Sequence, residues 1–294
     1  MRNNQQIYNR VTPIFFIIPL VLVLTCFVII PIIGTIITSF HQDIAFKELK
    51  FVFLNNYTDI LSDPNFWQSF RFTFLFTVVT VPIEICLGLL FALVLYIKHP
   101  LRFFLRTVVL IPWAIPAAIS ARVWELIYNY SYGLANYLIR ILHISSQPVN
   151  WLGTDIGAFS SLVLADVWKT TPFVAIIILA GLATIPEELY EQAKVDGSNF
   201  LQRFFNITLP LIRPVIVVSL LFRTADALRI FDIIYVITNG GPGGATSSVS
   251  HFSFQFFLNS DFGRSGAVSI ILFIIALAFS LLYLKFGKFK KDLS

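Results

Sequence analysis

The stretch VTPIFFIIPLVLVLTCFVIIPIIGTIITSFHQ at residues 11–42 contains no Lys, Arg, Asp or Glu. A helix needs about 20 mostly apolar residues to cross a bilayer. This stretch is longer, so it predicts one long, tilted helix with bends at Pro19, Pro31 and Gly34. It is too long for the apolar core of a signal peptide, and no cleavage site of small residues follows it. We therefore expect a retained membrane anchor.

The composition of the whole chain agrees with a membrane location. Its 294 residues are 57% hydrophobic and 13% charged, whereas a soluble domain has roughly 25% charged residues. So few charges cannot cover a surface that faces water. The composition excludes a soluble enzyme, a disordered chain and a nucleic-acid-binding domain, and it leaves an integral membrane protein.

Five more apolar stretches follow the first. They predict membrane spans at about 72–97, 107–121, 158–185, 215–238 and 267–284. Pro112 and Pro116 should kink the third span. The predicted fold is an all-α membrane protein with six transmembrane helices, which places both termini on the same side of the membrane.

The distribution of basic residues predicts which side that is. With the termini in the cytoplasm, twelve of the 21 Lys and Arg residues lie in inside segments, six lie outside and three lie within spans. Because cytoplasmic loops carry an excess of Lys and Arg, we expect both termini to be cytoplasmic. Basic residues beside helix ends meet anionic membrane lipids, which accounts for the net charge of +5 without a nucleic-acid partner.

The connection between the fourth and fifth predicted spans has strong helix signals. We call residues 186–210 of it the elbow. Thr184 and Glu187 predict a capping box at the start of a first helix, which should end near Val195. Asp196-Gly197 should break that helix, because glycine tolerates the backbone angles of a sharp reversal.

A second helix should follow the break. Asn199 and Gln202 predict its cap, and Pro210 and Pro214 should mark the return of the chain into the membrane. The elbow is therefore predicted to be two short amphipathic helices with a bend between them.

The charge of the first elbow helix bears on its partner. It carries Glu187, Glu188 and Glu191 against a single Lys194. A helix that merely rests on lipid has a Lys- and Arg-rich polar face, and an anionic membrane would repel this acidic one. The pattern favours a protein partner over a lipid surface.

Ionisable residues inside the predicted spans are functional candidates, because an unpaired charge is costly at membrane depth. They are Glu84, Asp166, Lys169, Arg223, Asp226, Arg229 and Asp232. Asp166 and Lys169 are three positions apart and can pair on one helix face. The last four residues alternate in sign at every third position, which favours a scaffold role over the lining of a polar translocation cavity. Glu84 either pairs with an Arg of another helix or acts as a gate.

Several motifs resemble one family closely. Glu191-Gln-Ala-x-x-Asp196-Gly197, continued by Phe204, Ile207, Leu209-Pro210 and Pro214, resembles the EAA motif of binding-protein-dependent ABC import permeases. Residues 110–116, 166–172, 229–232 and 238–243 resemble segments of the carbohydrate branch of that family, which includes maltose, trehalose and glycerol-phosphate permeases. Gln192 and Ser198 depart from the motif, since the family usually has Ala at these two positions.

The resemblance implies a type I ABC importer permease for a sugar or sugar-like solute in a bacterial or archaeal plasma membrane. It implies three kinds of partner: a second, similar permease, two copies of a cytoplasmic ATPase and an external solute-binding protein. The ATPase-coupling residues would be Glu191, Ala193, Asp196, Gly197, Phe200 and Phe204. Residues 1–66 would form the anchor and an external segment, residues 67–288 the permease core, and residues 289–294 a cytoplasmic tail.

The chain has no Walker motif, so ATP and Mg should be bound by the partner ATPase, and this chain should be a transport subunit and not an enzyme. We expect no cofactor, metal site or catalytic residue in it, since its four His residues are scattered. Gly240–Gly244 lacks the Gly-Lys-Ser/Thr ending of a phosphate loop. It is predicted to be a flexible external turn near the docking surface for a binding protein.

Two questions stay open at the level of sequence. Trp113, Tyr128 and Trp168 are candidates for stacking on a sugar, although the many Phe residues of this chain favour helix packing as the role of each. The alternative function is an ion-coupled secondary transporter or channel that uses the intramembrane carboxylates as proton or cation sites.

Overall fold

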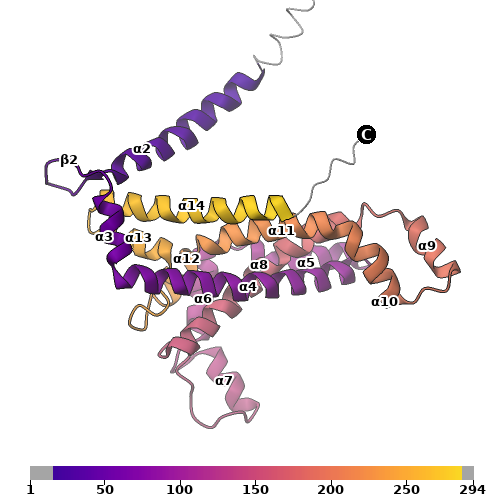
Figure 1. Cartoon of the computed structure of the whole chain (residues 1–294). Helices are drawn as coiled ribbons and strands as arrows, with labels where there is room; N and C mark the ends of the chain where they lie inside the picture. Colours follow the sequence, from indigo (N-terminus) through magenta and orange to yellow (C-terminus); the bar gives the residue numbers. More distant parts are fainter. Residues whose placement is uncertain (1–15, 287–294) are drawn as a thin grey trace, which may run out of the picture. The chain divides into compact units, whose positions relative to one another are not determined.

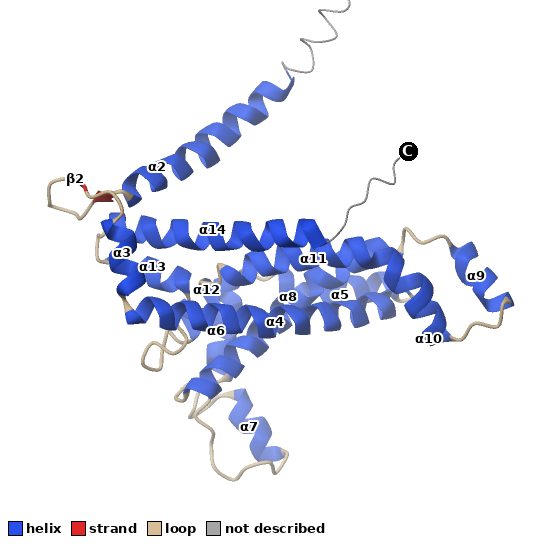
Figure 2. Ribbon diagram, in the orientation of Figure 1, coloured by secondary structure: helices blue, strands red, loops and turns tan. Residues whose placement is uncertain are grey.

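The computed structural model describes residues 16–286. Arg2, Arg10, Lys288, Lys290 and Lys291, which entered the orientation argument, and the predicted tail 289–294 lie outside the described residues. The described residues form helices and one short pair of strands (Figures 1 and 2). The chain divides into two compact units, residues 1–63 with 253–271 and residues 64–252 with 272–294.

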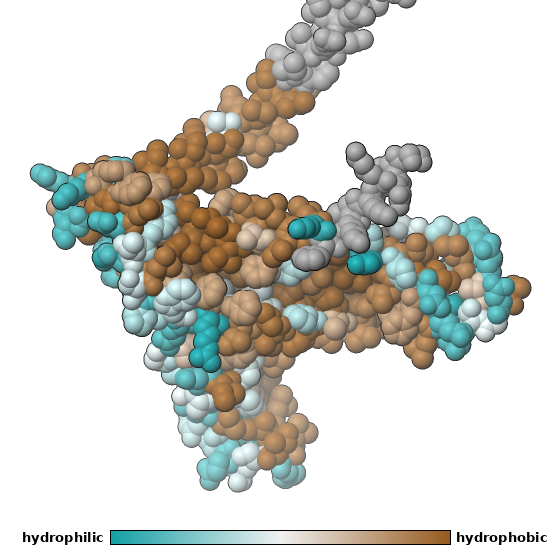
Figure 3. Space-filling view, in the orientation of Figure 1, coloured by the Kyte–Doolittle hydropathy of each residue, from teal (hydrophilic) through white to brown (hydrophobic). Residues whose placement is uncertain are grey.

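The first unit contains the predicted N-terminal span. This helix, Phe16–Ser39, includes the π-helical turn η1 (Thr25–Ile29) and α2 (Ile30–Ser39). It is followed by an antiparallel hairpin of β1 (His41–Gln42) and β2 (Lys50–Phe51), and then by α3 (Asn55–Ser62). The Asn56 amide donates to Ser39 O at 2.9 Å and to His41 O at 2.8 Å, which ties α3 to the end of α2. The apolar side chains of the span are exposed on the chain's surface, as contact with lipid requires (Figure 3).

The second unit is a helical bundle. Its elements are α4 (Pro64–Tyr96), α5 (Arg102–Ala114), α6 (Ala117–Ile127), α7 (Leu134–Ile141), α8 (Asp155–Leu182), α9 (Glu187–Val195), α10 (Phe200–Arg203), the π-helical turn η2 (Phe204–Thr208), α11 (Leu209–Leu228) and α12 (Asp232–Ile237). Two later helices, α13 (Val249–Leu258) and α14 (Phe262–Phe286), have residues in both units. Helix α4 packs along α8, and α11 packs against both.

A small residue sets the approach of α4 to α8. A Cβ atom placed on Gly88 would lie 2.5 Å from Val174 Cγ1, so only glycine fits at this contact. Small residues at helix contacts let backbones approach closely, which matters in a membrane, where hydrophobic burial between helices is weak.

The bundle has two apolar clusters. One joins Phe76 of α4 to Leu162 of α8 and Ile234 of α12, and the other joins Ala92 of α4 to Ile178 of α8 and Ile212 of α11.

The number of spans agrees with the prediction. Five helices are long and apolar enough to cross a membrane, and the pair α5 and α6 makes a sixth if it is one span with an 87° bend. The predicted kink lies at Pro116, the residue before α6, while Pro112 is accommodated inside α5. Ile115 is extended at the break, since the residue before a proline avoids the helical region.

The fifth span is the main correction to the predicted boundaries. Instead of residues 215–238, one continuous helix runs over Phe200–Leu228 and α12 follows as a separate helix. Pro210 and Pro214 therefore do not separate the second elbow helix from the span. The wide π-helical turn η2, in which Leu209 N donates to Phe204 O, immediately precedes Pro210 and lets the helix continue past it.

Candidate functional site

The bend of the elbow has the geometry that the sequence predicts. Helix α9 ends at Val195, and Gly197 has φ of +78°. Gly197 N donates to Lys194 O at 3.0 Å, and Ser198 N donates to Ala193 O at 2.9 Å. This is a Schellman motif, which satisfies the last carbonyls of α9 and reverses the chain.

The second helix of the elbow begins with the predicted cap. Gln202 N donates to Asn199 Oδ1 at 2.9 Å, and Asn199 N donates to Gln202 Oε1 at 2.8 Å. Arg203 Nη1 also donates to Ser198 O at 2.6 Å, which braces the turn. Both bonds of the cap are local, so the sequence was sufficient to predict it.

The start of α9 is built differently from the prediction. The Thr184–Glu187 capping box is wrong, because Pro186 precedes the helix and the Thr184 hydroxyl donates to Gly181 O at 2.8 Å. The Glu187 carboxylate instead accepts two hydrogen bonds from Lys98 Nζ, both at 2.7 Å. These bonds lower the pKa of Glu187 and raise the pKa of Lys98. In a capping box the Glu187 carboxylate would accept from a backbone N–H. In the structure it binds the Lys98 ammonium instead.

The elbow presents an acidic and apolar surface. Of the predicted coupling residues, Glu191, Asp196, Gly197 and Phe200 are exposed, while Ala193 and Phe204 are partly buried. The apolar side chains of Val195, Leu201 and Phe205 are also exposed. Tyr190 OH lies 2.9 Å from Thr208 Oγ1, which ties α9 to η2. Figure 1 shows α9 beyond the ends of α4 and α5, where a partner can reach it.

A second feature, the charge cluster, lies inside the bundle. It consists of Glu84 on α4, Asp166 on α8 and Arg223 on α11, all buried. Arg223 Nε and Nη2 donate to the two Glu84 carboxylate oxygens at 2.6 and 2.9 Å, and Nη2 lies 3.2 Å from Asp166 Oδ2. The Thr170 hydroxyl donates to Glu84 Oε1 at 2.7 Å. One guanidinium therefore joins three helices.

The charge series on α11 continues toward the surface for two more residues. Asp226 accepts from Arg223 Nη1 at 2.6 Å and from Arg229 Nη2 at 3.1 Å. Asp232 is not part of this series, because the helix breaks after Leu228 and Asp232 begins α12.

The predicted pairing of Lys169 with Asp166 is wrong, because Lys169 binds backbone carbonyls instead. Its ammonium donates to Trp113 O at 3.3 Å and to Ile115 O at 2.6 Å. These carbonyls lie at the C-terminal end of α5, where they have no helical partner and where the helix dipole favours a cation. Lys169 therefore stabilises the break between α5 and α6.

The aromatic candidates fall into two groups. Trp113 stacks on Phe173 at 5.6 Å between centroids. Trp168 and Tyr128 both contact Trp124, at 5.7 and 5.4 Å, and the Tyr128 hydroxyl donates to Ser161 O at 3.1 Å. Tyr128 is buried, whereas Trp113 and Trp168 are exposed. A role of these residues in solute binding stays a prediction.

A cavity that the sequence did not indicate lies between α6 and α12. It has a volume of about 620 Å³, and Arg122, Tyr235 and Asn239 supply its polar lining. Both helices follow breaks in longer helical segments, and broken helices form solute sites in many transporters. The Gly240–Gly244 turn follows α12 and is held internally, since Thr246 Oγ1 donates to Thr238 Oγ1 at 2.8 Å. Among residues 16–286 no group of acidic, His and Cys side chains has metal-site geometry.

The chain is similar to transport permeases over nearly its whole length. It is 52% identical over 277 residues to a trehalose/maltose transport system permease protein of Thermococcus litoralis, covering 94% of this chain and 93% of that protein. It is 34% identical over 280 residues to a sulfoquinovosyl glycerol transport system permease protein of Agrobacterium fabrum, covering 94% and 90% of the two chains.

The fold is similar to that of a solved transporter chain. A bacterial ABC transporter involved in the import of the acidic polysaccharide alginate matches with a TM-score of 0.84 at 21% identity, covering 99% of this chain and 100% of that chain. The predicted fold of an ABC importer permease is thereby confirmed. Residues 84–287, more than half of the chain, match the family described as binding-protein-dependent transport system inner membrane component. The chain belongs to this family, the permease subunits of ABC importers.

Proposed function

We propose that this permease subunit imports a sugar or sugar-like solute across the plasma membrane of a bacterium or archaeon. The names of its relatives support the solute class, since one transports trehalose and maltose and another a sulfoquinovosyl glycerol. Its elbow is the observation on which the coupling to ATP depends. An acidic, partly apolar surface at the end of the bundle suits docking to a soluble protein better than lying on anionic lipid.

Two features of this chain suggest its partners, namely the missing Walker motif and the exposed elbow. It has no Walker motif, so a cytoplasmic ATPase, present as two copies, binds ATP and Mg and docks on the elbow. A second, similar permease completes the membrane part, and an external binding protein delivers the solute. Glu191 gives the ATPase a polar contact, Ala193 allows close approach, and Asp196 and Gly197 form the bend. Phe200 and Phe204 complete the docking surface.

The connections of the elbow suggest how movement is transmitted. Closure of the ATPase dimer pulls on α9, which is tied through Lys98 to the connection that follows α4 and through Tyr190 to η2. The continuous helix Phe200–Leu228 then carries the movement to Arg223, which holds α4 and α8. The helices move together and the transporter passes from an inward-open to an outward-open state.

The charge cluster has a scaffold role in this mechanism. Glu84 and Asp166 share a buried guanidinium, which leaves them paired instead of free to bind a cation. The cavity between α6 and α12 is a better candidate for solute contact, because Arg122, Tyr235 and Asn239 combine hydrogen-bonding groups with an aromatic ring.

Transport in vesicles distinguishes this function from ion coupling. The assembled transporter is reconstituted with ATP inside and the solute-loaded binding protein outside, and ionophores collapse the ion gradients. We expect uptake to persist under these conditions and to require ATP. Uptake that stops when the gradient is collapsed, with ATP still present, would support the ion-coupled alternative. The solutes that the cognate binding protein retains define which radiolabelled sugars to supply.

A further inference from the structure

A separate pocket lies in the hairpin between α6 and α8, residues 129–153, which contains α7. This hairpin precedes the N-terminal end of α8, and the elbow follows its C-terminal end. Helix α8 is long and apolar enough to span the membrane, so the pocket and the elbow lie on opposite sides. With the elbow in the cytoplasm, the pocket faces the side from which the solute arrives.

Asn136 holds the walls of the pocket in place. Its amide nitrogen donates to Tyr130 O at 3.0 Å and to Val149 O at 3.1 Å. Its side-chain oxygen accepts from Val149 N and from Trp151 Nε1, both at 3.0 Å. One nearly buried side chain thus fastens both ends of the hairpin, and the pocket is formed before any ligand binds.

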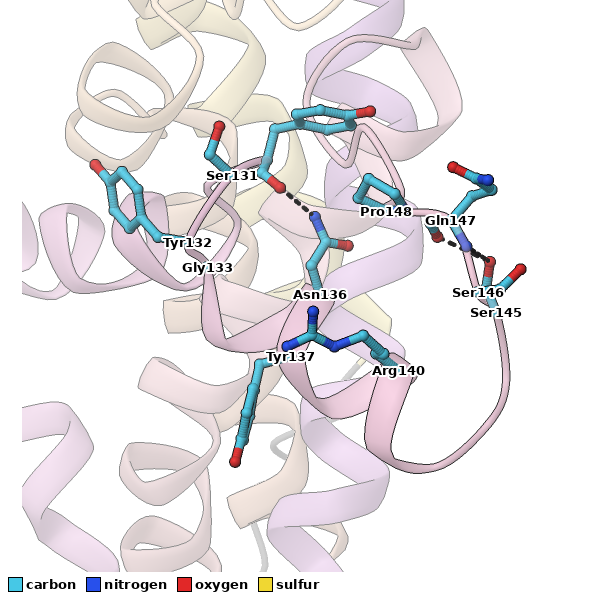
Figure 4. A pocket seen from close by; sticks show the side chains of 11 residues that line it. Ser131, Tyr132, Gly133, Asn136, Tyr137, Arg140, Ser145, Ser146, Gln147 and Pro148 are labelled. Atoms are coloured by element: carbon cyan, nitrogen blue, oxygen red, sulfur yellow. Dashed lines mark hydrogen bonds between the residues drawn. The ribbon is translucent and has the colours of Figure 1, made fainter.

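The lining of the pocket combines aromatic rings with polar groups. Its volume is about 270 Å³, and Tyr130, Tyr132, Tyr137 and Arg140 contribute to it. Figure 4 shows Tyr132 and Tyr137 toward one side, residues 145–147 toward the other, and the Arg140 guanidinium between them. The residues Tyr130, Tyr132 and Tyr137 are each at least half exposed.

The polar atoms of these side chains are available to a ligand. Within residues 16–286, the hydroxyls of Tyr130, Tyr132 and Tyr137 make no hydrogen bond, and Arg140 makes no ion pair. The Arg140 guanidinium lies 6.0 Å from the centre of the Tyr137 ring, which orients its donors. Arg140 supplies charged donors and no carboxylate lines the pocket, so the lining favours a neutral ligand rich in hydrogen-bond acceptors.

We propose that this pocket binds one pyranose unit of an oligosaccharide on the outer face of the permease. The C–H face of a sugar ring packs against exposed Tyr rings, and its hydroxyls accept from Arg140 and exchange hydrogen bonds with Ser146 and Gln147. This site is distinct from the cavity between α6 and α12, and it holds a saccharide near the outer surface before translocation. The choice of a saccharide, but not the pocket itself, rests on the proposed function.

A local probe tests the site directly. 3-Fluorotyrosine is placed at position 137 of the full-length chain, which is purified with the subunits that accompany it, without ATP or binding protein. Maltotriose is added and the fluorine resonance is followed. We expect a saturable shift whose midpoint rises about tenfold in Tyr132→Ala and in Arg140→Gln, because each removes one direct contact. The same label at Tyr283, in α14, should not respond.

Matched controls separate binding from general effects. Arg213→Gln removes an exposed charge outside the pocket and should leave the midpoint unchanged. Sorbitol offers hydroxyls without a ring face, and a shift equal to that of maltotriose would overturn the proposal. So would midpoints in Tyr132→Ala and Arg140→Gln that match the wild type. Because the readout needs no transport, a shift that persists when sugar uptake is absent would refute the proposed function alone.

Discussion

Arg223 is a single guanidinium that serves two buried carboxylates, those of Glu84 and Asp166. Its side chain is 3% exposed, and that of Glu84 is 0% exposed. A buried ion pair is weak evidence of net stability, because desolvation offsets the attraction. Removing one partner of such a pair is nevertheless strongly destabilising, because the remaining charge stays buried without a counter-charge.

Replacing Arg223 should therefore lower the free energy of unfolding far more than replacing its neighbour Arg229. We expect Arg223→Met to destabilise the chain by about 3–5 kcal/mol, measured by thermal unfolding in detergent. Arg229→Met, at a side chain that is 74% exposed, should have little effect. Adding Glu84→Gln to Arg223→Met should recover part of the loss. Equal effects of the two Arg substitutions would contradict the role of Arg223.

Gly197 tests the bend of the elbow. Its φ of +78° excludes proline, whose φ is fixed near −65°, and proline also lacks the N–H that bonds to Lys194 O. We expect Gly197→Pro to abolish uptake and ATPase association while membrane insertion stays normal.

Gly197→Ala should cost about 1–2 kcal/mol of backbone strain. No atom lies within 4 Å of an added Cβ, so this cost comes from the backbone alone. Gly197→Asn should be tolerated better, and full transport by the Pro variant would refute the coupling role.

At the scale of elements, α9 depends on contacts with distant parts of the chain. It is held by Lys98, two residues after the end of α4, and by Thr208 in η2. Beyond the bend, α10, η2 and α11 act as one helix, because the π-helical turn accommodates Pro210. The elbow is therefore a short helix held against a long one, which is the arrangement a lever requires.

The Lys98–Glu187 pair should make the anchoring of α9 depend on pH. The pKa of Glu187 is lowered, so its contribution exists above the ordinary carboxyl pKa and disappears as pH falls through the lowered value. The pKa of Lys98 is raised, so its contribution exists below the ordinary lysine pKa and disappears as pH rises through the raised value. The pair is thus intact at neutral pH.

Hydrogen exchange measures this effect. We expect Lys98→Gln to lower the protection factors of the α9 amides modestly at pH 7, because the pair is exposed to solvent. Salt at about 0.5 M should shrink the difference between variant and wild type by screening, and acid below the Glu187 pKa should abolish it. Arg213→Gln is the matched control. A difference that is unchanged by both acid and salt would contradict the ionic role of this pair.

At the scale of the molecule, close packing of α4, α8 and α11 brings the charge cluster together. Gly88 permits the contact of α4 with α8, and Gly181 permits that of α8 with α11, where an added Cβ would lie 2.8 Å from Val215 Cγ2. Along α4 and α8 the charge cluster lies between the two apolar clusters. The same packing therefore positions the buried charges and excludes lipid from them.

Gly88→Ala should disturb this packing. The added Cβ would lie 2.5 Å from Val174 Cγ1 and 3.2 Å from Ala175 N, so rotation of one side chain cannot relieve the overlap. We expect a loss of about 1–3 kcal/mol in thermal unfolding, and Val174→Ala in the same chain should recover part of it. Gly34→Ala, where no atom lies within 4 Å, is the control and should be close to neutral. Equal stability of Gly88→Ala and the wild type would refute the close contact.

Features that depend on neighbouring residues could be predicted from the sequence. The apolar runs predicted the membrane class and the spans, because crossing a bilayer requires about 20 apolar residues wherever they occur. Asp196-Gly197 and the Asn199–Gln202 cap were also predictable, since their hydrogen bonds join residues five or fewer positions apart. The EAA motif similarly indicated the family that the comparisons confirm.

Pairs that join distant residues were decided by the tertiary structure alone. Glu84 and Arg223 are 139 positions apart, and Lys98 and Glu187 are 89 positions apart. A local pattern instead suggested Lys169 as the partner of Asp166, and Pro210 and Pro214 suggested where the chain returns into the membrane. Whether such a charge meets a local or a distant partner depends on which helix faces pack together. That choice follows from side-chain fit in three dimensions, including the space that Gly88 leaves, and spacing along the chain does not encode it.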